Sequence, residues 1–525
     1  MEPSCVRQNL IPGTTRLFTD FLYHPDRVEQ FYPSTFNDPD SFRAAREKLN
    51  YPDARRGDLV NALREQNGDS PELEKLARSE TVAVVTGQQV GLLSGPCYTI
   101  FKALTAVKLA RHLEEEGIPA VPIFWLASED HDFAEVDHAW IFDRSTKPIK
   151  ISVANAVTTG GPVGEVVLED LPFNEIEAAL EGLPFAGDVV ARLRAAYRNG
   201  TTFSAAFRAF LEQILCDCGL LYLDPLAPAI RRLARPFLEE VTERVPRLLE
   251  RLKERNDELS AAGYHTQVNL DEGASLLFQL EEAKRTPVRW KDGRFTVKDG
   301  RFSPPEFREL AGQLSPNALL RPVLQDYLLP TLSYVGGPAE IAYMAQGQVL
   351  YDELLGRMPV LFPRNSFTLL DVRAQKLLDR YDLHLPDVLD HQEKVKSRIA
   401  ARLVPQNLAS EFASVEATVS DTLADLEKNL AGFDPTLENA ARKSASKMKY
   451  QLHKLSEKTA RETLRRDQRS SADADYLVNL IYPHRRLQER FYSIVPFLAK
   501  HGLDLPDRIL AMTQITCPDH MVRTV

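Results

Sequence analysis

The sequence lacks the features of a membrane or secreted protein. No apolar run approaches the ~20 residues that a membrane-spanning helix needs, and the N-terminus, Met1 to Cys5, has neither the charged start nor the apolar core of a secretory signal. Cysteine is scarce, because the chain of 525 residues has only five, an odd number that does not suit a disulfide framework. We therefore expect a cytoplasmic protein without a membrane partner.

Long basic runs are also missing. The formal net charge is −10, which argues against nucleic acid as the main partner. Cys216 and Cys218 have no second cysteine or histidine pair nearby at zinc spacing, so no metal site is predicted. The hydrophobic content of 44% is ordinary for a globular protein, and the length predicts two or three structural units.

What the chain does have is two polar turns that each follow a short apolar run. Residues 81–86 and 120–127 read as buried strands, and a helical apolar pattern runs between them from about Pro96 to Gly117. A glycine-rich turn follows the first strand and the acidic stretch 129–132 follows the second. In an open parallel sheet both turns lie at the carboxyl ends of strands, where such folds bind ligands.

The glycine-rich turn has two interpretations. Its glycines are Gly87, Gly91 and Gly95. They would let the backbone approach an anion at a helix N-terminus, with Lys102 adding charge and with Gln88 and Gln89 adding hydrogen bonds. The spacing matches neither a Walker A loop nor a dinucleotide-binding loop. Tight packing explains the same glycines equally well.

The stretch Glu129-Asp130-His131-Asp132 places three carboxylates around one imidazole. Such a group is costly unless it is solvated, paired or bound to a ligand. A neighbouring carboxylate can fix the tautomer of His131, which makes this residue a candidate general acid or base. The alternative is a solvated turn in which Asp132 caps the next helix.

A third group of candidate site residues lies later in the chain. Gly337 lies in a glycine turn that opens a helix, and Glu340 and Tyr343 share one face of that helix. Arg364 and Ser366 follow the apolar run 359–362, so they also lie at a strand end. Arg364 is suited to grip a carboxylate or phosphate with two hydrogen bonds, or to form a structural ion pair.

Three further segments interrupt this core. Residues 137–175 predict a β-rich insertion, and the Asp-Gly steps at 292–293 and 299–300 predict hairpins in a second one. Between 385 and 465, apolar residues recur at heptad spacing in two runs separated by a break at 432–436. Two such runs around a tight break predict an antiparallel helical hairpin.

Together these motifs resemble a known family. The motifs are Thr86-Gly-Gln-Gln-x-Gly-Leu-Leu-x-Gly-Pro-x-Tyr-Thr, Phe-Trp-Leu-Ala-x-Glu-Asp-His-Asp, Gly-Gly-Pro-x-Glu-Ile-Ala-Tyr and Pro-Arg-x-Ser-Phe-Thr. The chain is similar over its whole length to the bacillithiol biosynthesis cysteine-adding enzymes, the BshC family. The resemblance implies an α/β fold with a Rossmann-like, nucleotidyltransferase-type core, two small β-containing inserts and a C-terminal antiparallel coiled-coil arm.

The resemblance also implies how the chain is divided. The expected segments are core 1–136, first insert 137–190, core 191–270, second insert 271–325, core 326–384, coiled coil 385–470 and a C-terminal core segment 471–525.

The implied activity is addition of L-cysteine to glucosaminyl-malate, giving bacillithiol, by an enzyme that acts as a homodimer. Forming this amide requires an activated carboxyl group, so ATP and Mg²⁺ are expected cofactors. The candidate catalytic residues are His131, Asp132, Asp130, Lys102 and Arg364. The candidate binding residues are Gly87, Gln88, Gln89, Gly91, Gly95, Thr99, Glu129, Gly337, Glu340, Tyr343 and Ser366. Arg364 or Lys102 would stabilise phosphoryl charge, and His131 or Asp132 would take the proton of the attacking amine.

Two other functions fit the same residues. One is an ATP-dependent ligase or nucleotidyltransferase for another small carboxylic acid, because glycine turns specify anions and not cysteine. The other is a non-catalytic scaffold built around the coiled coil, although a scaffold has no need of the polar strand ends.

Overall fold

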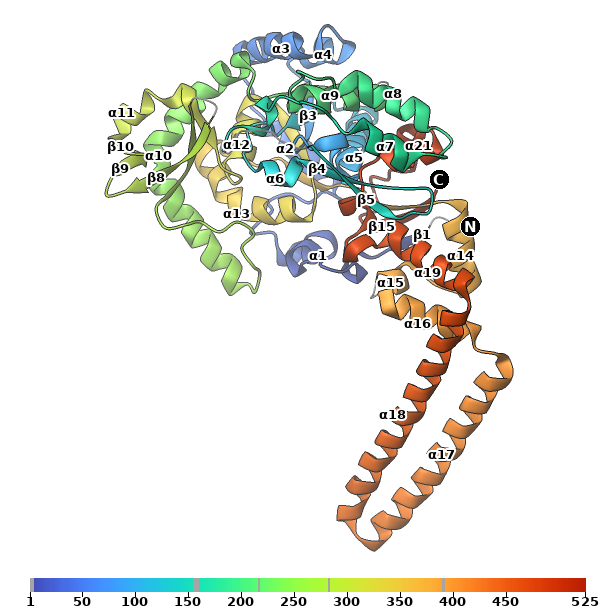
Figure 1. Ribbon diagram of the computed structural model, residues 1–525. Helices are drawn as coiled ribbons and strands as arrows, with labels where there is room; N and C mark the ends of the chain where they lie inside the picture. Colours follow the sequence, from blue (N-terminus) through green and yellow to red (C-terminus); the bar gives the residue numbers. More distant parts are fainter. Residues whose placement is uncertain (1–3, 154–159, 216–217, 282–283, 390–391) are drawn as a thin grey trace. The chain divides into compact units, whose positions relative to one another are not determined.

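The computed structural model divides the chain into two compact units, which are described separately (Figure 1). The structure describes residues 4–153, 160–215, 218–281, 284–389 and 392–525, so Cys216 lies outside the described residues. The first unit comprises Met1–Arg144, Pro148–Thr368 and Glu489–Arg523, and the second comprises Ser145–Lys147, Leu369–Gln488 and Thr524–Val525.

A five-stranded, fully parallel sheet forms the centre of the first unit. Its strands are β2 (Val82–Gln88), β3 (Ala120–Leu126), β6 (Leu221–Leu223), β12 (Thr331–Gly336) and β13 (Val360–Pro363). They lie in the order β13-β12-β2-β3-β6 with every pairing parallel. Numbered along the chain this is 3-2-1-4-5, the Rossmann order, whose topological switch point lies between β2 and β12. The predicted α/β class and Rossmann-like core are confirmed.

Two helices begin next to the switch point. Helix α5 (Tyr98–Glu115) links β2 to β3 and packs on both strands, as the apolar pattern predicts. It ends before Gly117, whose φ of +80° suits a residue without a side chain. Helix α13 (Pro338–Leu354) leaves the end of β12, so the starts of α5 and α13 follow the two strands that flank the switch point.

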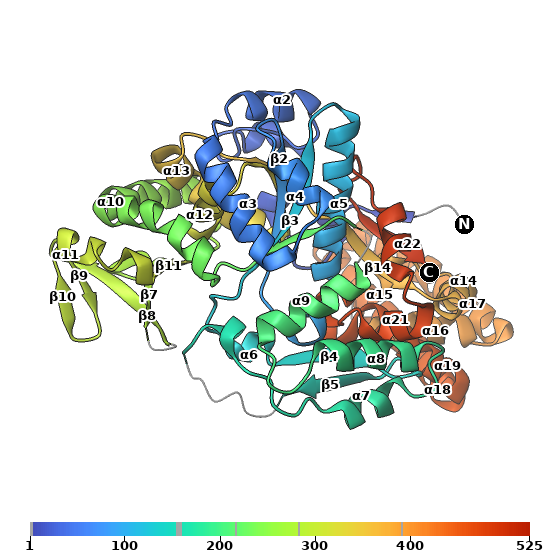
Figure 2. The same cartoon turned by 90° about the horizontal axis from the view of Figure 1, so that it is seen from above.

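The two predicted β-containing inserts are present in the first unit (Figure 2). The first contains the antiparallel hairpin of β4 (His138–Phe142) and β5 (Pro148–Ser152). It is followed by helices α7 (Phe173–Leu180), α8 (Ala186–Ala196) and α9 (Phe203–Ile214). Helix α10 (Pro228–Ala261) then leads to the second insert.

The second insert is an antiparallel sheet in the order β10-β9-β8-β7-β11. Its strands are β7 (Ala274–Glu281), β8 (Lys284–Lys291), β9 (Arg294–Val297), β10 (Gly300–Phe302) and β11 (Leu314–Pro316). Asp292 and Gly293 both have positive φ, 49° and 71°, and form the predicted two-residue turn between β8 and β9. The next turn is centred on Lys298 and Asp299, one residue before the predicted Asp-Gly step.

A smaller sheet brings the two ends of the chain together. Strand β1 (Ser4–Val6) pairs antiparallel with β15 (His520–Thr524), and β15 neighbours β14 (Ser366–Leu370). The C-terminal segment therefore lies beside the strand that follows Arg364. This arrangement joins residues about 500 positions apart, so periodicity could not predict it.

The second unit contains the predicted helical hairpin. Helices α17 (Gln406–Phe433) and α18 (Pro435–Arg466) run antiparallel and contact each other (Figure 1). Asp434 caps α18 by accepting a hydrogen bond from Thr436 N–H, as the break at 432–436 predicts. The unit also holds α14 (Val372–Tyr381), α16 (Gln392–Leu403) and α19 (Gln468–Ile481). Within the described ranges no helix carries an apolar stretch long enough to cross a bilayer.

Candidate active site

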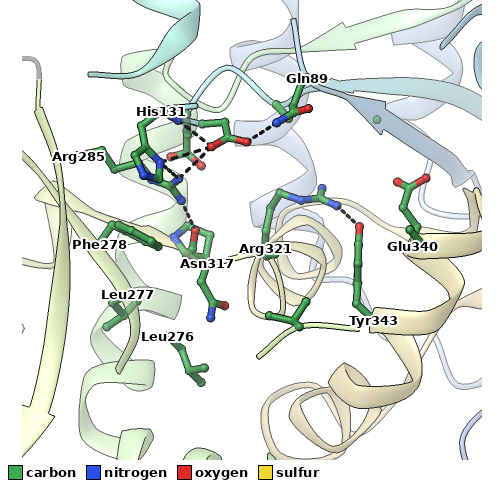
Figure 3. A pocket seen from close by; sticks show the side chains of 18 of the residues that line it. Gln89, His131, Leu276, Leu277, Phe278, Arg285, Asn317, Arg321, Glu340 and Tyr343 are labelled. Atoms are coloured by element: carbon green, nitrogen blue, oxygen red, sulfur yellow. Dashed lines mark hydrogen bonds and ion pairs between the residues drawn. The ribbon is translucent and has the colours of Figure 1, made fainter. Parts of the chain in front are cut away.

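A cavity of about 620 Å³ opens at the carboxyl ends of β2, β3 and β12 (Figure 3). Its volume lies in the range of small-molecule sites. The predicted residues that line it are Gly87, Gln88, Gln89, Lys102, Glu129, Asp130, His131, Gly337, Glu340, Tyr343 and Arg364. Five others, Gly91, Gly95, Thr99, Asp132 and Ser366, are not part of its lining.

The second insert supplies a wall that sequence analysis missed. Leu276, Leu277 and Phe278 lie on the side of the cavity opposite Glu340 and Tyr343 (Figure 3). The antiparallel sheet of this insert places them there, and a single apolar strand gives no signal of facing a ligand. The cavity thus has one apolar wall and one polar wall, which suits a ligand with both kinds of surface.

Gly87 is required at the end of β2 because the neighbouring strand is too close for a side chain. A Cβ at this position would lie 2.9 Å from the backbone oxygen of Trp125 and 3.0 Å from its Cβ. The missing side chain lets the glycine turn continue directly from the sheet into the cavity wall.

The ammonium group of Lys102 donates all its hydrogen bonds to acceptors within the protein. Its Nζ lies 2.6 Å from Gly87 O, 3.1 Å from Gln88 Oε1 and 2.6 Å from Glu340 Oε2. An ammonium group has three donors, so all of them are used. Lys102 is 2% exposed and joins the two glycine turns across the switch point, which leaves no donor for the phosphoryl role that the sequence suggested.

Glu340 is the anionic partner of this junction. It accepts hydrogen bonds from Tyr334 OH at 2.5 Å and Gly337 N–H at 2.8 Å, besides the contact with Lys102. Burial alone would raise the pKa of Glu340, but the Lys102 ammonium and these donors together hold it below its usual value. Glu340 is therefore an ionised structural anchor at the start of α13.

A second cluster surrounds Asp130 at the end of β3, and we call Gln89, Asp130, His131 and Arg285 the acid–histidine cluster (Figure 3). Asp130 accepts hydrogen bonds from Gln89 Nε2 at 2.5 Å and from the backbone N–H of His131 at 2.7 Å. Arg285 Nη1 lies 3.6 Å from Asp130 and 3.2 Å from His131 Nδ1.

Arg285 connects the second insert to the acid–histidine cluster. Its guanidinium donates to Ser315 Oγ at 3.0 Å and to Pro316 O at 2.7 Å, and it stacks 4.0 Å over the ring of Phe278. The side chain is 9% exposed. No local sequence pattern identified Arg285, because its role depends on an insert folding back onto β3.

The cluster keeps Asp130 ionised. Burial alone would raise the pKa of Asp130, but the hydrogen bonds from the His131 backbone N–H and Gln89 and the charge of Arg285 lower it far below its usual value. Arginine can only donate, and it is closer to His131 Nδ1 than Asp130 is, at 3.2 Å against 3.4 Å. We therefore assign the imidazole proton to Nε2.

The other two carboxylates of the acidic stretch have different surroundings. Glu129 is 8% exposed and pairs with Arg231 Nη1 at 3.1 Å. Asp132 is exposed and precedes α6 (Phe133–Val136), but its side chain makes no capping hydrogen bond. The structure thus brings Asp130 and His131 together as predicted and separates Asp132 from them.

The start of α5 is filled by protein and not by an anion site. Cys97 N–H donates to Tyr492 O at 2.7 Å, and a Cβ on Gly91 would lie 3.0 Å from Gly95 Cα. Thr99 is fully buried there. Tight packing, the second interpretation of these glycines, describes this part of the turn, and only Tyr98 and Lys102 of α5 line the cavity.

Arg364 also has a protein partner, and we call Arg364, Ser366 and Glu489 the arginine clamp. Arg364 Nη1 and Nη2 lie 2.9 and 2.7 Å from the two carboxylate oxygens of Glu489, which also accept from Ser366 Oγ and Phe367 N–H. Burial alone would raise the pKa of Glu489, but Arg364 lowers it, so the pair stays ionised. The structural ion pair foreseen for Arg364 is confirmed.

His520 completes the arginine clamp from β15. Its Nδ1 lies 2.6 Å from Ser366 Oγ and its Nε2 lies 2.7 Å from Thr368 Oγ1. Because the Ser366 hydroxyl donates to Glu489, it accepts from Nδ1–H, and Nε2 then accepts from Thr368. A neutral imidazole therefore satisfies every partner.

This burial predicts a pH-dependent loss of stability. Burial lowers the pKa of His520 to about 4, against about 6.5 in an unfolded chain. Between these values the unfolded state binds the extra proton, so stability is complete above pH 6.5 and falls as the pH drops toward 4, by about 3 kcal/mol. Urea unfolding at several pH values should show this slope in the wild type and a flatter one in His520→Gln. Equal slopes would contradict it.

Two lining arginines, Arg490 and Arg289, are exposed and form no ion pair with any residue that the structure describes. Arg289 donates to the backbone oxygen of Glu272 at 3.1 Å. Arg321, also in the lining, donates to Tyr343 OH at 3.1 Å and to Gln325 at 3.2 Å (Figure 3). No group of three or more metal-ligating side chains occurs among the described residues.

These features define a class: a Rossmann-like α/β protein with a mixed polar and apolar ligand cavity at its topological switch point, followed by a helical hairpin. Comparison with family models agrees. Residues 1–365 match the bacillithiol biosynthesis BshC N-terminal Rossmann-like domain, and residues 367–525 match the BshC C-terminal coiled-coil domain. The chain belongs to the BshC family of bacillithiol biosynthesis proteins.

Full-length relatives support the same conclusion. A protein of Solibacter usitatus is 49% identical over the whole of both chains, and one of Koribacter versatilis is 37% identical over 99% of each. A protein of Salinibacter ruber is 30% identical over 96% of this chain and 95% of its own. Each of the three is named "Putative cysteine ligase BshC".

Proposed function

We propose that this protein joins the carboxyl group of L-cysteine to the amino group of glucosaminyl-malate, forming the amide bond of bacillithiol. The observation that carries this proposal is the acid–histidine cluster at the switch-point cavity of a BshC-family chain. The cavity offers an apolar wall, an unpaired arginine and an oriented imidazole in one space. These suit two small polar substrates held side by side.

The positions of the available cations indicate where an anionic group of a ligand would bind in the cavity. Lys102 and Arg364 are paired with carboxylates, so they are poor candidates for holding a phosphate or a substrate carboxylate. We propose Arg490, together with Arg321 from the same cavity lining, in that role, because a guanidinium binds such groups with two parallel hydrogen bonds. The malate carboxylates and the phosphates of a nucleotide share this chemistry.

We propose His131 as a hydrogen-bond donor to the reacting groups. With the proton on Nε2, the imidazole presents N–H to the cavity, where it can stabilise the oxyanion formed when the amine attacks the activated carboxyl group. This differs from the general-base role that the sequence suggested. Arg285 donates to His131 Nδ1, and Asp130 positions both residues by pairing with Arg285 and accepting from the His131 backbone N–H.

Two variants separate these roles. Glutamine can place an amide N–H close to the position of Nε2, so His131→Gln is expected to keep at least about ten times more kcat/KM than His131→Ala, which should lose about 100-fold. If His131 is the general base, both variants lose activity equally. Steady-state kinetics with matched circular dichroism spectra distinguishes the two results.

ATP is proposed as the co-substrate that activates the carboxyl group, and Mg²⁺ as its counterion. The carboxylates that line the cavity near the glycine turns, Glu129, Asp130 and Glu340, are each close to a protein cation. They do not form a cage for a metal, and Mg²⁺ typically binds proteins through one or two carboxylates plus substrate phosphates. We therefore assign no protein-held metal and derive no step through one.

The test is an assay of the purified full chain with cysteine, glucosaminyl-malate, ATP and Mg²⁺, analysed by mass spectrometry. Formation of bacillithiol with AMP supports an adenylate, and formation with ADP supports an acyl phosphate. If no bacillithiol forms but another carboxylic acid is consumed in place of cysteine, the protein is a ligase for that acid. Omission of ATP is the control for an uncatalysed route.

We also propose a homodimer formed through the α17–α18 hairpin. Several apolar residues of this hairpin stay exposed: Val415 by 46%, Leu426 by 49%, Phe433 by 84%, Met448 by 52% and Leu455 by 54%. A second copy of the same hairpin has the heptad spacing to cover them. Charged substitutions at Val415 and Leu455 are expected to convert a dimer into monomers in sedimentation analysis; unchanged sedimentation argues against this surface.

A further inference from the structure

Two cysteines from opposite ends of the chain lie next to each other in the first unit. The Sγ atoms of Cys5 and Cys517 are 3.8 Å apart, and both are free thiols. Cys5 is exposed and Cys517 is partly exposed, whereas Cys97 and Cys218 are buried. Neither cysteine lines the cavity. Their proximity has no part in the proposed ligase reaction.

The backbone holds this pair in place. Cys5 lies in β1 and pairs with Met521 of β15, four residues beyond Cys517. Gln8 Nε2 donates to Pro518 O at 3.3 Å, and Tyr23 OH donates to Asp519 Oδ1 at 2.6 Å. The segment around Cys517 is therefore fixed against the N-terminal residues, and a bond of about 2.05 Å needs the sulfurs to approach by only about 1.8 Å.

We propose that Cys5 and Cys517 form a redox-modification site, in which a low-molecular-weight disulfide oxidises the two thiols to a reversible intramolecular disulfide. This inference goes beyond the proposed function and does not depend on it. The two thiols are close, accessible and positioned by separate hydrogen bonds, which is the geometry that thiol–disulfide exchange requires.

The exchange proceeds in two balanced steps. The Cys5 thiolate attacks one sulfur of the small disulfide, giving a mixed disulfide and releasing one small thiolate. The Cys517 thiolate then attacks Cys5 Sγ, forming the protein disulfide and releasing the second small thiolate. The two protein thiols are oxidised, the small disulfide is reduced to two thiols, and the two protons pass to the released thiolates.

The exposure of the two cysteines determines their order. Cys5 is the accessible one and reacts first. Burial and the neighbouring Cys5 raise the pKa of the Cys517 thiol, so it reacts second, when a mixed disulfide has formed beside it. This assignment makes Cys517 the resolving residue.

Oxidation is expected to stabilise the folded protein. The disulfide would covalently link β1 to the segment that enters β15, and β15 carries His520, which bonds to Ser366 beside Glu489 and Arg364. A crosslink between residues so far apart in the chain restricts the unfolded state strongly. The oxidised protein should therefore unfold at a higher temperature than the reduced protein.

The experiment treats the reduced full-length protein with oxidised glutathione, then removes the reagent and titrates thiols after denaturation. The expected result is loss of two of the five thiols, no retained glutathione, and a tryptic crosslink between residues 1–7 and 509–523. Dithiothreitol should restore all five thiols and the lower unfolding temperature. Non-reducing electrophoresis should show a monomeric chain.

Single variants make the result decisive. Cys517→Ser should retain one glutathione on Cys5, because no resolving thiol remains, and Cys218→Ser should behave like the wild type apart from one fewer thiol. Stable glutathionylation of the wild type at Cys5, a crosslink between two copies, or five unreacted thiols would each overturn the proposal. All of these readouts are independent of ligase activity.

Discussion

Replacing Glu489 by alanine is expected to produce one of the largest losses of stability of any single substitution in this protein. Arg364 is 5% exposed and would be left as an uncompensated buried cation, and Ser366 and Phe367 would lose an acceptor. Removal of one member of a buried ion pair costs about 3–5 kcal/mol. Urea unfolding monitored by circular dichroism should show this decrease in the free energy of unfolding.

A double variant provides the control. Arg364→Met with Glu489→Leu removes both charges, and such replacements are often close to neutral for stability. We expect the double variant to recover most of the stability lost in Glu489→Ala. If it also recovers activity, the arginine clamp is only structural; if activity stays low, the Arg364 side chain also contributes to the cavity that it lines. A Glu489→Ala protein as stable as the wild type would contradict the arginine clamp itself.

Replacing Asp130 by asparagine is expected to have the largest effect on activity. The substitution removes the charge that Gln89, His131 and Arg285 surround. Arg285 then loses its anionic partner, so it no longer holds His131 Nδ1 and the imidazole leaves the productive orientation. We expect kcat/KM to fall by about 100-fold or more, in line with the loss of an oriented catalytic group. Because the ionised Asp130 also stabilises the nearly buried Arg285, the unfolding temperature should fall as well, so the kinetics are measured at a temperature at which both proteins are folded.

Asp132→Asn is the matched control for this prediction. The two residues are close in sequence and undergo the same chemical change, but Asp132 is exposed and outside the cavity lining. We expect near-normal kinetics for Asp132→Asn. Equal losses in the two variants would restore Asp132 to the catalytic role that the sequence suggested and would argue against the acid–histidine cluster as the centre of the reaction.

The parts of the site that could be predicted are those made by neighbours in the chain. Asp130 and His131 follow a strand directly, and Glu340 and Tyr343 share a helix face, so the strand–turn–helix pattern places them at the cavity. Arg285 and Leu276 were missed because an insert of antiparallel strands carries them to the cavity. Arg490 lies in the aromatic and basic stretch 482–492, which is compatible with a charged contact to a ligand, but no local pattern places it at this cavity.

The roles of the charged residues were harder to predict than their positions. Lys102 and Arg364 do line the cavity, but their partners come from other parts of the chain: Glu340 is 238 positions from Lys102, and Glu489 is 125 positions from Arg364. A sequence shows that a cation is present near a site, and only the fold shows whether its donors are already used. A cation whose donors are already used stabilises the fold, whereas a cation with unused donors can bind a ligand.

By itself, the sequence determined the parallel α/β core, the two inserts, the helical hairpin and the strand ends that line the cavity. Those follow from local periodicity and turn chemistry, which act over a few residues. Only the tertiary structure decided which cations are free, which way the His131 proton points, and that Cys5 meets Cys517. These properties depend on distances between residues far apart in the chain, because hydrogen bonds, ion pairs and thiol exchange operate only over a few ångströms.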